Sequence, residues 1–290
     1  MNIYHLKYFI DAARFQSVSL SAKENLVSHS AVSQAIKSLE AHFEVNLVFH
    51  SKRLFQLTPE GELCFIEGQK ILRQLADVKD HLQANRNIVR GTLSIWAPQS
   101  LIAESLYKSL ALYQNKYPQV QVNIKPGAAA VVRSAVLSGE GNLGIIIDDG
   151  FIDQFEYANI KTGDFVLIGP SKKSKPTLNE KTEVIVTSRE KIEVQHLKKN
   201  FKSKFRTELK IKMEVMSWGV IKNLVEKGFG IGYVPDYCVS HELSIGLLGK
   251  LESPKSAFKY QVAAIWAPNK QLHPNAKLFI EILKQQANHP

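Results

Sequence analysis

The sequence predicts an α/β protein whose N-terminus is rich in helix, followed by a long connecting helix and a larger unit of two α/β lobes. The chain of 290 residues exceeds one average core, since domains of about 100 to 150 residues make it two or three. Apolar residues recur at helical spacing in the first part of the chain, whereas short apolar runs alternate with helices from Gly91 onward. We therefore expect domains at residues 1–58, 59–90 and 91–290.

Two supporting helices are predicted first. Ile3 to Phe15 forms a helix because its apolar residues recur at helical spacing along one stripe. Ser17 is a cap-type residue before a short second helix from Leu20 to Leu26. Ala22 and Leu26 are expected to face inward from that second helix.

The third predicted helix, Ser28 to Phe43, has two faces of different chemistry. Its buried face is Val32, Ile36, Leu39 and Phe43. Its outer face is His29, Ser30, Ser33, Gln34 and Lys37. Hydroxyl and amide groups exchange hydrogen bonds with base edges and a lysine reaches phosphate, although an ordinary solvated face has the same composition. A polar-faced third helix after two supporting helices and a tight turn is typical of a helix-turn-helix, so we expect the outer face to contact DNA.

A small wing is predicted after the third helix. Asn46 to His50 and Leu54 to Leu57 are two short extended stretches around a basic turn. Lys52 and Arg53 at this tip are expected to contact the sugar-phosphate backbone or the minor groove. An exposed turn without a partner is the alternative.

The order of residues in this region resembles the winged helix-turn-helix of LysR-type transcriptional regulators. The resemblance is carried by Ser17 to Leu26, Ser28 to Glu40 and Leu57 to Gly61. It implies a sequence-specific regulator that binds double-stranded promoter DNA as a homodimer or homotetramer, responds to a small-molecule effector and contacts RNA polymerase. The sequence departs from the family pattern at Ser21, Glu44, Val48 and His50, and His29 stands where the family often has glutamine.

A long connecting helix is predicted from Thr58, an N-cap residue, through Pro59 to about Asn87. An apolar seam with 3.5-residue spacing runs along it, widened by Leu72 and interrupted by Gly68. The seam consists of Cys64, Ile71, Leu75, Val78 and Leu82. A dimer seam between two such helices is favoured over packing against the same chain. The resemblance implies that the two helices pair antiparallel.

The remaining chain alternates strands and helices, which favours a mostly parallel sheet with helices on both faces. The predicted strands are Leu93–Ala97, Val120–Ile124, Leu143–Ile147, Phe165–Ile168, Thr182–Val186, Lys210–Met216, Ile231–Val234 and Tyr260–Ala267. The predicted helices are Ile102–Tyr117, Val131–Leu137, Val220–Lys227 and Asn275–Ala287.

This unit resembles the periplasmic-binding-protein-like effector domain of the same family. The resemblance is carried by Tyr117 to Val120, Gly139, Leu143 to Ile145, and Leu224 to Gly232 before Pro235. It implies lobe I at about residues 91–161 and 266–290, and lobe II at about 162–265.

Ligands in such folds bind beyond the carboxyl ends of the strands, between the lobes. Three loops there supply the expected effector-binding residues Gln99, Ser100, Ala128, Ser217 and Trp218. Each is also compatible with a plain helix cap or strand-end loop. Asp148 and Asp149 would weaken binding of an anion unless they are paired, so a small polar effector of open charge is expected.

The charge distribution is uneven. The net charge is +10, but residues 1–90 hold 11 Lys and Arg against 9 Asp and Glu, a net of +2, which leaves +8 for the rest. The excess is concentrated between Lys172 and Lys212, a stretch that is either a solvated face or an anion-binding surface.

Several classes of protein and site are disfavoured. Cys64 and Cys238 are far apart and match no metal-ligand spacing, so no disulfide, metal or cofactor is expected. GxSxG, HExxH, Walker and GxGxxG patterns are absent, and Gly228 to Gly232 lies between a helix and a strand in the reverse order of a dinucleotide loop, so an enzyme is not expected. Met1 to Phe15 lacks a signal-peptide core and no apolar run approaches the roughly 20 residues that cross a bilayer, so a cytoplasmic protein without a membrane partner is expected.

Overall fold

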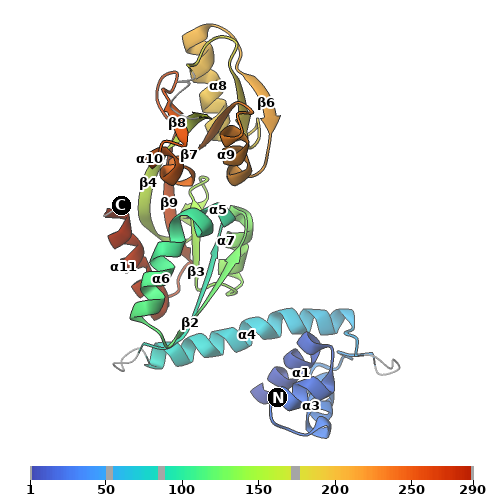
Figure 1. Ribbon diagram of the computed structural model, residues 1–290. Coiled ribbons are helices and arrows are strands. Elements are labelled where there is room, and N and C mark those ends of the chain that lie inside the picture. Colours follow the sequence, from blue (N-terminus) through green and yellow to red (C-terminus); the bar gives the residue numbers. More distant parts are fainter. Residues whose placement is uncertain (1, 50–54, 84–88, 171–176, 289–290) are drawn as a thin grey trace. The chain divides into compact units, whose positions relative to one another are not determined.

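The computed structural model describes residues 2–49, 55–83, 89–170 and 177–288 (Figure 1). The chain divides into two compact units. The N-terminal unit comprises Met1–Ile88 with Ser138–Glu140, and the C-terminal unit comprises Val89–Leu137 with Gly141–Pro290.

The N-terminal unit contains the helices α1 (Ile3–Phe15), α2 (Val18–Glu24), α3 (His29–Phe43) and α4 (Pro59–Gln83). The side chains of Asn2, Ser17 and Ser28 cap the first three helices by accepting backbone N–H groups. Leu6, Phe9 and Ile10 of α1 pack with a row of apolar residues from α3, which are Val32, Ile36 and Leu39. The predicted helices are therefore confirmed over the described residues, with α2 beginning and ending two residues earlier than expected. The predicted end of the long helix near Asn87 lies outside the described residues.

Two inward-facing predictions in this unit are wrong. Phe43 is 43% exposed, because it is the last residue of α3 and lines an open apolar groove instead of the core. Leu26 is 92% exposed and has a φ of 54°. The helix α2 ends at Glu24, so Leu26 belongs to the turn before α3 and is carried out of the apolar stripe that Ala22 joins.

Two glutamates shape the chain after α3. Glu44 ends the helix in the left-handed region, with a φ of 56°. The buried carboxylate of Glu40 accepts the backbone N–H groups of Leu47 and Val48 at 2.8 and 3.2 Å. This anchors the start of the predicted wing to α3.

The wing is described only at its base. Val48 and Leu57 form an isolated antiparallel bridge, and the N–H of Phe49 donates to the carbonyl oxygen of Gln56 at 3.0 Å. Lys52 and Arg53, the expected DNA contacts of the tip, lie outside the described residues.

The C-terminal unit is built on a nine-stranded sheet within the described residues, in the order β2-β1-β3-β9-β4-β7-β5-β6, with β8 paired to β4. The strands of lobe I and the crossing segments are β1 (Gly91–Ala97), β2 (Val120–Pro126), β3 (Leu143–Ile147), β4 (Glu156–Pro170) and β9 (Lys259–Trp266). The other strands are β5 (Glu183–Val186), β6 (Lys210–Glu214), β7 (Ile231–Pro235) and β8 (Leu248–Leu251).

The sheet is mixed, which corrects the expectation of a mostly parallel sheet. Parallel pairing holds inside each lobe, between β1 and both β2 and β3, and between β5 and both β6 and β7. The crossing strands β4 and β9 run antiparallel to each other and to the strands beside them. Since β4 spans 15 residues where only four were predicted, the crossing segment is extended sheet and not loop.

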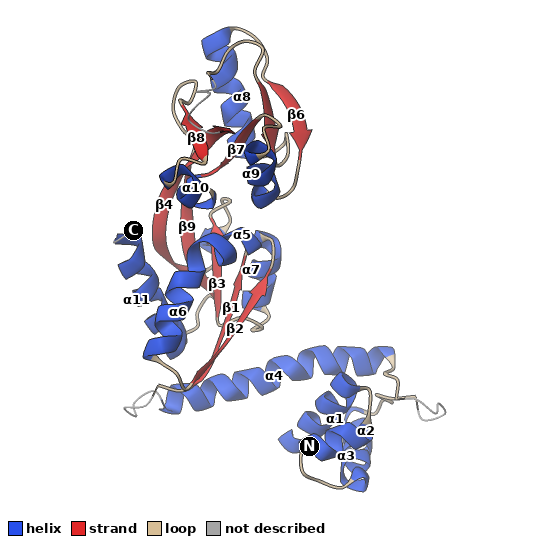
Figure 2. Ribbon diagram, in the orientation of Figure 1, coloured by secondary structure: helices blue, strands red, loops and turns tan. Residues whose placement is uncertain are grey.

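Helices cover both faces of the lobe I sheet (Figure 2). The helix α7 (Ala129–Leu137) places Val132 and Val136 against Ile146 and Ile265. On the other face, α6 (Tyr107–Lys116) and α11 (Pro274–Asn288) pack together, with the Tyr113 ring edge-on to Phe279 at 5.5 Å between centroids.

Several elements differ from the sequence-based prediction. The expected helix after β1 is divided into α5 (Gln99–Leu101), a π-helical turn η1 (Ile102–Leu106) and α6. The helices α8 (Ile192–Phe205) and α10 (Ser240–Ser244), the 3-10 turns η2 (Ile152–Gln154) and η4 (Asp236–Cys238), and the strand β8 were not predicted, whereas α9 (Trp218–Glu226) was. Within the described ranges, every helix is too short or too polar to cross a membrane.

Candidate nucleic-acid interface and interlobe site

The five predicted DNA-contacting residues of α3 share the face opposite its buried stripe. His29, Ser30, Gln34 and Lys37 are exposed and Ser33 is half-buried. Among the described residues, the side chains of Gln34 and Lys37 have no hydrogen-bond or ion-pair partner, although both are held on a helix whose other face is fully packed. A ligand along this face would therefore meet an amide and an amine that are not already engaged.

The N-terminal turn of α3 is ordered by hydroxyl groups. The Ser28 hydroxyl accepts the N–H of Ala31 at 3.1 Å and lies 2.9 Å from the Ser30 hydroxyl. The Ser33 hydroxyl lies 3.5 Å from Nδ1 of His29, at the long limit of a hydrogen bond. Small side chains here let another backbone approach closely, whereas His29 is held only loosely.

Buried polar groups fix the two supporting helices. The Ser21 hydroxyl is fully buried and donates to the carbonyl oxygen of Tyr8 at 2.8 Å. Asp11 is also buried, and its carboxylate is paired with Lys7 and Arg14 and accepts the amide of Asn25 at 3.0 Å. Because Asn25 is the C-cap residue of α2, this network ties α1 to the turn that precedes α3.

The connecting helix α4 docks its first turns on the same unit. The Thr58 hydroxyl accepts the N–H of Gly61 at 2.9 Å, which confirms the predicted cap. The same hydroxyl donates to the backbone carbonyl oxygen of Asn46 at 2.6 Å. A Cβ on Gly61 would lie 2.0 Å from the carbonyl oxygen of Leu47, so only glycine allows this approach. The predicted seam residue Cys64 is half-buried against the N-terminal core, as is Leu72.

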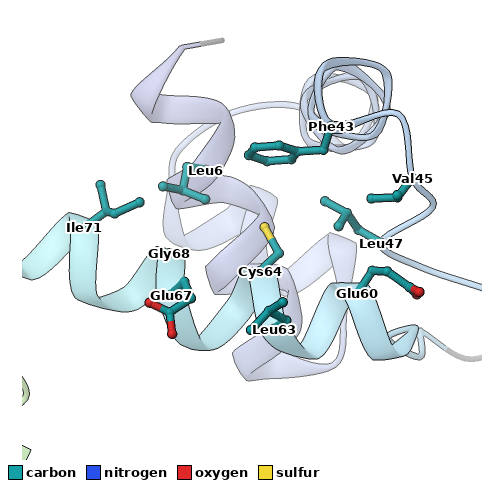
Figure 3. A pocket seen from close by; sticks show the side chains of 10 residues that line it. All are labelled: Leu6, Phe43, Val45, Leu47, Glu60, Leu63, Cys64, Glu67, Gly68 and Ile71. Atoms are coloured by element: carbon teal, nitrogen blue, oxygen red, sulfur yellow. The ribbon is translucent and has the colours of Figure 1, made fainter. Parts of the chain in front are cut away.

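The rest of the seam is exposed within the chain. Ile71, Leu75, Val78 and Leu82 are 45%, 52%, 54% and 77% exposed. Near Ile71, an apolar groove of about 400 Å³ lies between α4, α1 and the end of α3 (Figure 3). Its lining is Leu6, Phe43, Val45, Leu47, Glu60, Leu63, Cys64, Glu67, Gly68 and Ile71. The groove and the exposed seam share Ile71 and form one apolar surface of α4.

Two of the predicted effector-binding residues meet at Tyr237 in the C-terminal unit. The Ser100 hydroxyl lies 3.0 Å from the Tyr237 hydroxyl, and Trp218 meets the Tyr237 ring edge-on at 6.4 Å between centroids. The indole N–H of Trp218 is buried and has no hydrogen-bond partner among the described residues. Ser217 caps α9. Gln99 is exposed and its side chain makes no hydrogen bond within the described part of the chain, and the methyl group of Ala128 is exposed.

Sequence reasoning missed two lysines beside these residues. Lys161 of β4 donates to the Ser105 hydroxyl at 2.8 Å and lies 5.5 Å from the centre of the Tyr237 ring. Burial lowers the pKa of Lys161, and the nearby Asp236 opposes that shift. Lys161 lies in a crossing strand that periodicity did not reveal, so no local pattern pointed to it.

Lys222 forms a second link across the interlobe region. Its amine is paired with Glu104 of the π-helical turn at 3.2 Å and with Glu242 of α10 at 2.7 Å. Burial alone lowers the pKa of Lys222, but the hydrogen bonds to Glu242 and Glu104 outweigh that effect and raise the pKa. Lys222 lies one helical turn after Trp218, which is the only sequence signal that could have suggested it.

The two aspartates after β3 differ in their partners. Asp149 accepts two hydrogen bonds of 2.7 Å from the Arg133 guanidinium, and Asp148 accepts the N–H of Gly150 at 2.8 Å. The charge of Asp149 is therefore neutralised by Arg133, whereas Asp148 has no ion pair among the described residues and still disfavours an anion beside it. Cys238 is buried beside Tyr237, and burial raises the pKa of its thiol to about 12.

Two family models match this chain. The model described as "Bacterial regulatory helix-turn-helix protein, lysR family" matches residues 3–62, and "LysR substrate binding domain" matches residues 86–288. A Probable RuBisCO transcriptional regulator of Emiliania huxleyi is 26% identical over 261 residues, 84% of this chain and 81% of that protein. One from Nostoc sp. is 26% identical over 290 residues, 93% of this chain and 84% of that protein.

The fold is shared with solved LysR family structures. CbnR, a LysR family transcriptional regulator, aligns with a TM-score of 0.65 at 20% identity, covering 99% of both chains. Full-length CbnR complexed with its target DNA gives a TM-score of 0.67 at 21% identity, covering 99% of this chain and 100% of that one. Full-length OxyR from Pseudomonas aeruginosa aligns with a TM-score of 0.67 at 19% identity, covering 100% of this chain and 98% of that one.

Proposed function

Since this chain belongs to the LysR family and is a DNA-binding transcription regulator, we propose that the outer face of α3 reads its promoter. Ser33 and Gln34 contact base edges, with His29 and Ser30 at the same end of the helix, and Lys37 contacts phosphate. The domains that serve this function are residues 1–58 for DNA, 59–90 for pairing of subunits and 91–290 for the effector. The family is one of regulators, a non-enzymatic class.

One observation carries the proposal. Among the described residues, the side chains of Gln34 and Lys37 have no hydrogen-bond or ion-pair partner, and they lie on the solvent face of a helix whose other face is packed in the core. An amide can make two hydrogen bonds to the edge of adenine, and an amine can neutralise a phosphate. The modest charge of +2 over residues 1–90 supports recognition by base contacts more than by bulk attraction. Lys52 and Arg53 of the wing are proposed to add sequence-independent backbone contacts.

The regulator is proposed to act as a homodimer or homotetramer. The exposed residues Leu75, Val78 and Leu82 of α4, together with the apolar groove at Ile71, offer a surface that a second copy of α4 would cover. A two-fold assembly presents two copies of α3 to two half-sites at fixed spacing.

The effector is proposed to bind between the lobes, near Gln99, Ser100, Ala128, Ser217 and Trp218. The buried indole N–H of Trp218 is a donor that a polar ligand could engage. A ligand there would compete with the links that Tyr237 makes to Ser100 and Lys161. Altered closure of the lobes would then change the spacing of the DNA-reading heads, DNA bending and recruitment of RNA polymerase.

The experiment is binding of the full chain to genomic fragments, followed by footprinting of the retained fragments. The proposal predicts a protected site with two related half-sites, and retention that random duplex competes poorly. Equal competition by random duplex and by the retained fragment would contradict it.

A further inference from the structure

The helix α8 of the C-terminal unit presents a surface of a single charge sign. Within α8 the only acidic residue is Glu193, which is buried, and burial raises the pKa of its carboxyl group. Every other charged residue of the helix and of its C-cap is basic. These residues are Lys198, which is half-buried, and the exposed Lys199, Lys202, Lys204 and Arg206. We call this set the α8 basic surface.

An ordinary solvated helix explains this surface only in part. Positive charges in the last turn are favourable against the helix dipole, which accounts for Lys202 and Lys204. Lys198 and Lys199 lie further from that end, and each has a like charge three or four residues away, which destabilises a helix by about 0.2–0.5 kcal/mol per pair. The acids that normally relieve such repulsion are missing from the exposed face of α8.

Internal pairing within the chain is weak. Among the described residues, the α8 basic surface has one ion pair, between Lys202 and Glu208. Both side chains are largely exposed, at 65% and 70%, and such surface pairs contribute little. Lys198 donates only to the carbonyl oxygen of Arg189, at 3.5 Å. The repulsion between these basic side chains is therefore not compensated within the described residues, and an anion bound from outside would reduce it.

The spacing of the surface fits a polyanion. Lys198, Lys202 and Arg206 are four residues apart, and at 1.5 Å per residue they succeed one another about every 6 Å along one stripe. A DNA strand carries one phosphate per about 3.4 Å of helix axis, so the stripe matches roughly every second phosphate. Lys210 and Lys212, exposed on the edge strand β6, add charge to the same lobe, although lysines also protect an open sheet edge.

We propose that the α8 basic surface is a second DNA-binding surface, which contacts the phosphate backbone without reading bases. It accounts for a charge distribution in which residues 1–90 hold +2 and the remainder holds +8 of the net +10. The inference rests on the chain being a DNA-binding regulator, but not on the base contacts assigned to α3. DNA that flanks the site read by α3 is the occupant.

The test is a full-length variant with Lys198→Gln, Lys199→Gln, Lys202→Gln and Arg206→Gln. A matched control removes four exposed lysines elsewhere in the same unit, with Lys227→Gln, Lys270→Gln, Lys277→Gln and Lys284→Gln. Dissociation constants on a promoter fragment with long flanks are measured from low to moderate salt. Thermal unfolding of both variants checks that they fold as the unmodified chain does.

Each phosphate that a protein neutralises adds about 0.9 to the slope of log affinity against log salt. The α8 variant is therefore expected to flatten this slope by about 2 to 4 for each subunit whose α8 basic surface contacts the DNA. The control is expected to keep the slope, and both variants are expected to keep the preference for promoter over random duplex. Trimming the flanks is expected to remove the difference between the α8 variant and the unmodified chain.

Equal slopes for the α8 variant and the control would overturn the proposal. The proposal would also be overturned if the α8 variant kept its salt slope but lost transcription activation in a promoter assay. That result would assign the surface to a protein partner. If the unmodified chain shows no preference for any promoter, the role of α3 fails instead, and the slope measured on random duplex still decides the role of α8.

Discussion

The exposed seam of α4 makes a quantitative prediction for dimerisation. Replacing two of its central residues, with Leu75→Ala and Val78→Ala, removes apolar side chains that make little contact within the chain. Complete burial of such a side chain stabilises by about 1.5–3 kcal/mol. Leu75 and Val78 are 52% and 54% exposed, so a partner helix can bury about half of each, for about 1 kcal/mol per side chain.

Symmetry doubles that effect. In a two-fold dimer each residue occurs in both copies, while alanine keeps part of the contact, so the double variant is expected to weaken association by about 3 kcal/mol. At 1.4 kcal/mol per factor of ten, the dimer dissociation constant rises by roughly 100-fold. The thermal stability of the separate N-terminal core is expected to change little, because neither side chain belongs to it.

Sedimentation equilibrium over a dilution series measures this constant directly. A matched control is Ile66→Ala on the same helix, since Ile66 is 50% exposed and lies about 180° from Leu75 at roughly 100° per residue. The control is expected to dimerise as the unmodified chain does. If the double variant and the control show the same dissociation constant as the unmodified chain, the seam is not the dimer interface.

Three other predictions concern stability. Glu40→Ala leaves two buried N–H groups without their acceptor and is expected to lower the free energy of urea unfolding of the N-terminal unit by about 2–4 kcal/mol. The control Glu44→Gln, at an exposed residue, is expected to have little effect, and equal losses from both variants would refute the anchoring role of Glu40. Gly61→Ala forces a Cβ against a backbone carbonyl and is expected to cost more than about 1 kcal/mol, and an unchanged melting temperature would contradict that contact. Lys222→Met leaves the carboxylates of Glu104 and Glu242 unpaired and is expected to lower the unfolding free energy of the C-terminal unit, measured by calorimetry, by about 3–5 kcal/mol. Adding Glu104→Gln to this variant is expected to restore part of that stability, and no restoration would exclude the Lys222–Glu104 pair as the cause of the loss.

Local patterns predicted the N-terminal helices well, because their apolar residues form continuous stripes and each begins at a capping side chain. The outer face of α3 followed from the same periodicity. The position of Leu26 did not, since it depends on a left-handed turn between two helices and not on helical spacing.

Contacts between residues far apart in the chain could not be predicted from local sequence patterns. The strand β4 is extended over 15 residues because it pairs with β9, about 100 residues later, although the exposed first half of β4 lacks an apolar pattern. The helix α8 was missed because lysines dilute its apolar stripe, in which Val194, Leu197 and Phe201 are buried. Lys222 acquired a role only when the fold brought it to Glu104, a residue 118 positions away.

The central claim is that α3 reads bases with Gln34 while Lys37 holds the backbone. The most direct measurement is the ratio of affinities for a footprinted promoter site and a scrambled duplex, in Gln34→Ala and in Lys37→Ala. A bidentate base contact discriminates by about 1–3 kcal/mol, so Gln34→Ala is expected to lower the ratio by roughly 5- to 100-fold and to bind scrambled duplex as before. Lys37→Ala is expected to weaken both complexes alike and, because each of two subunits loses one phosphate contact, to flatten the salt slope by about 1.8. Equal losses on both duplexes from Gln34→Ala would contradict the claim.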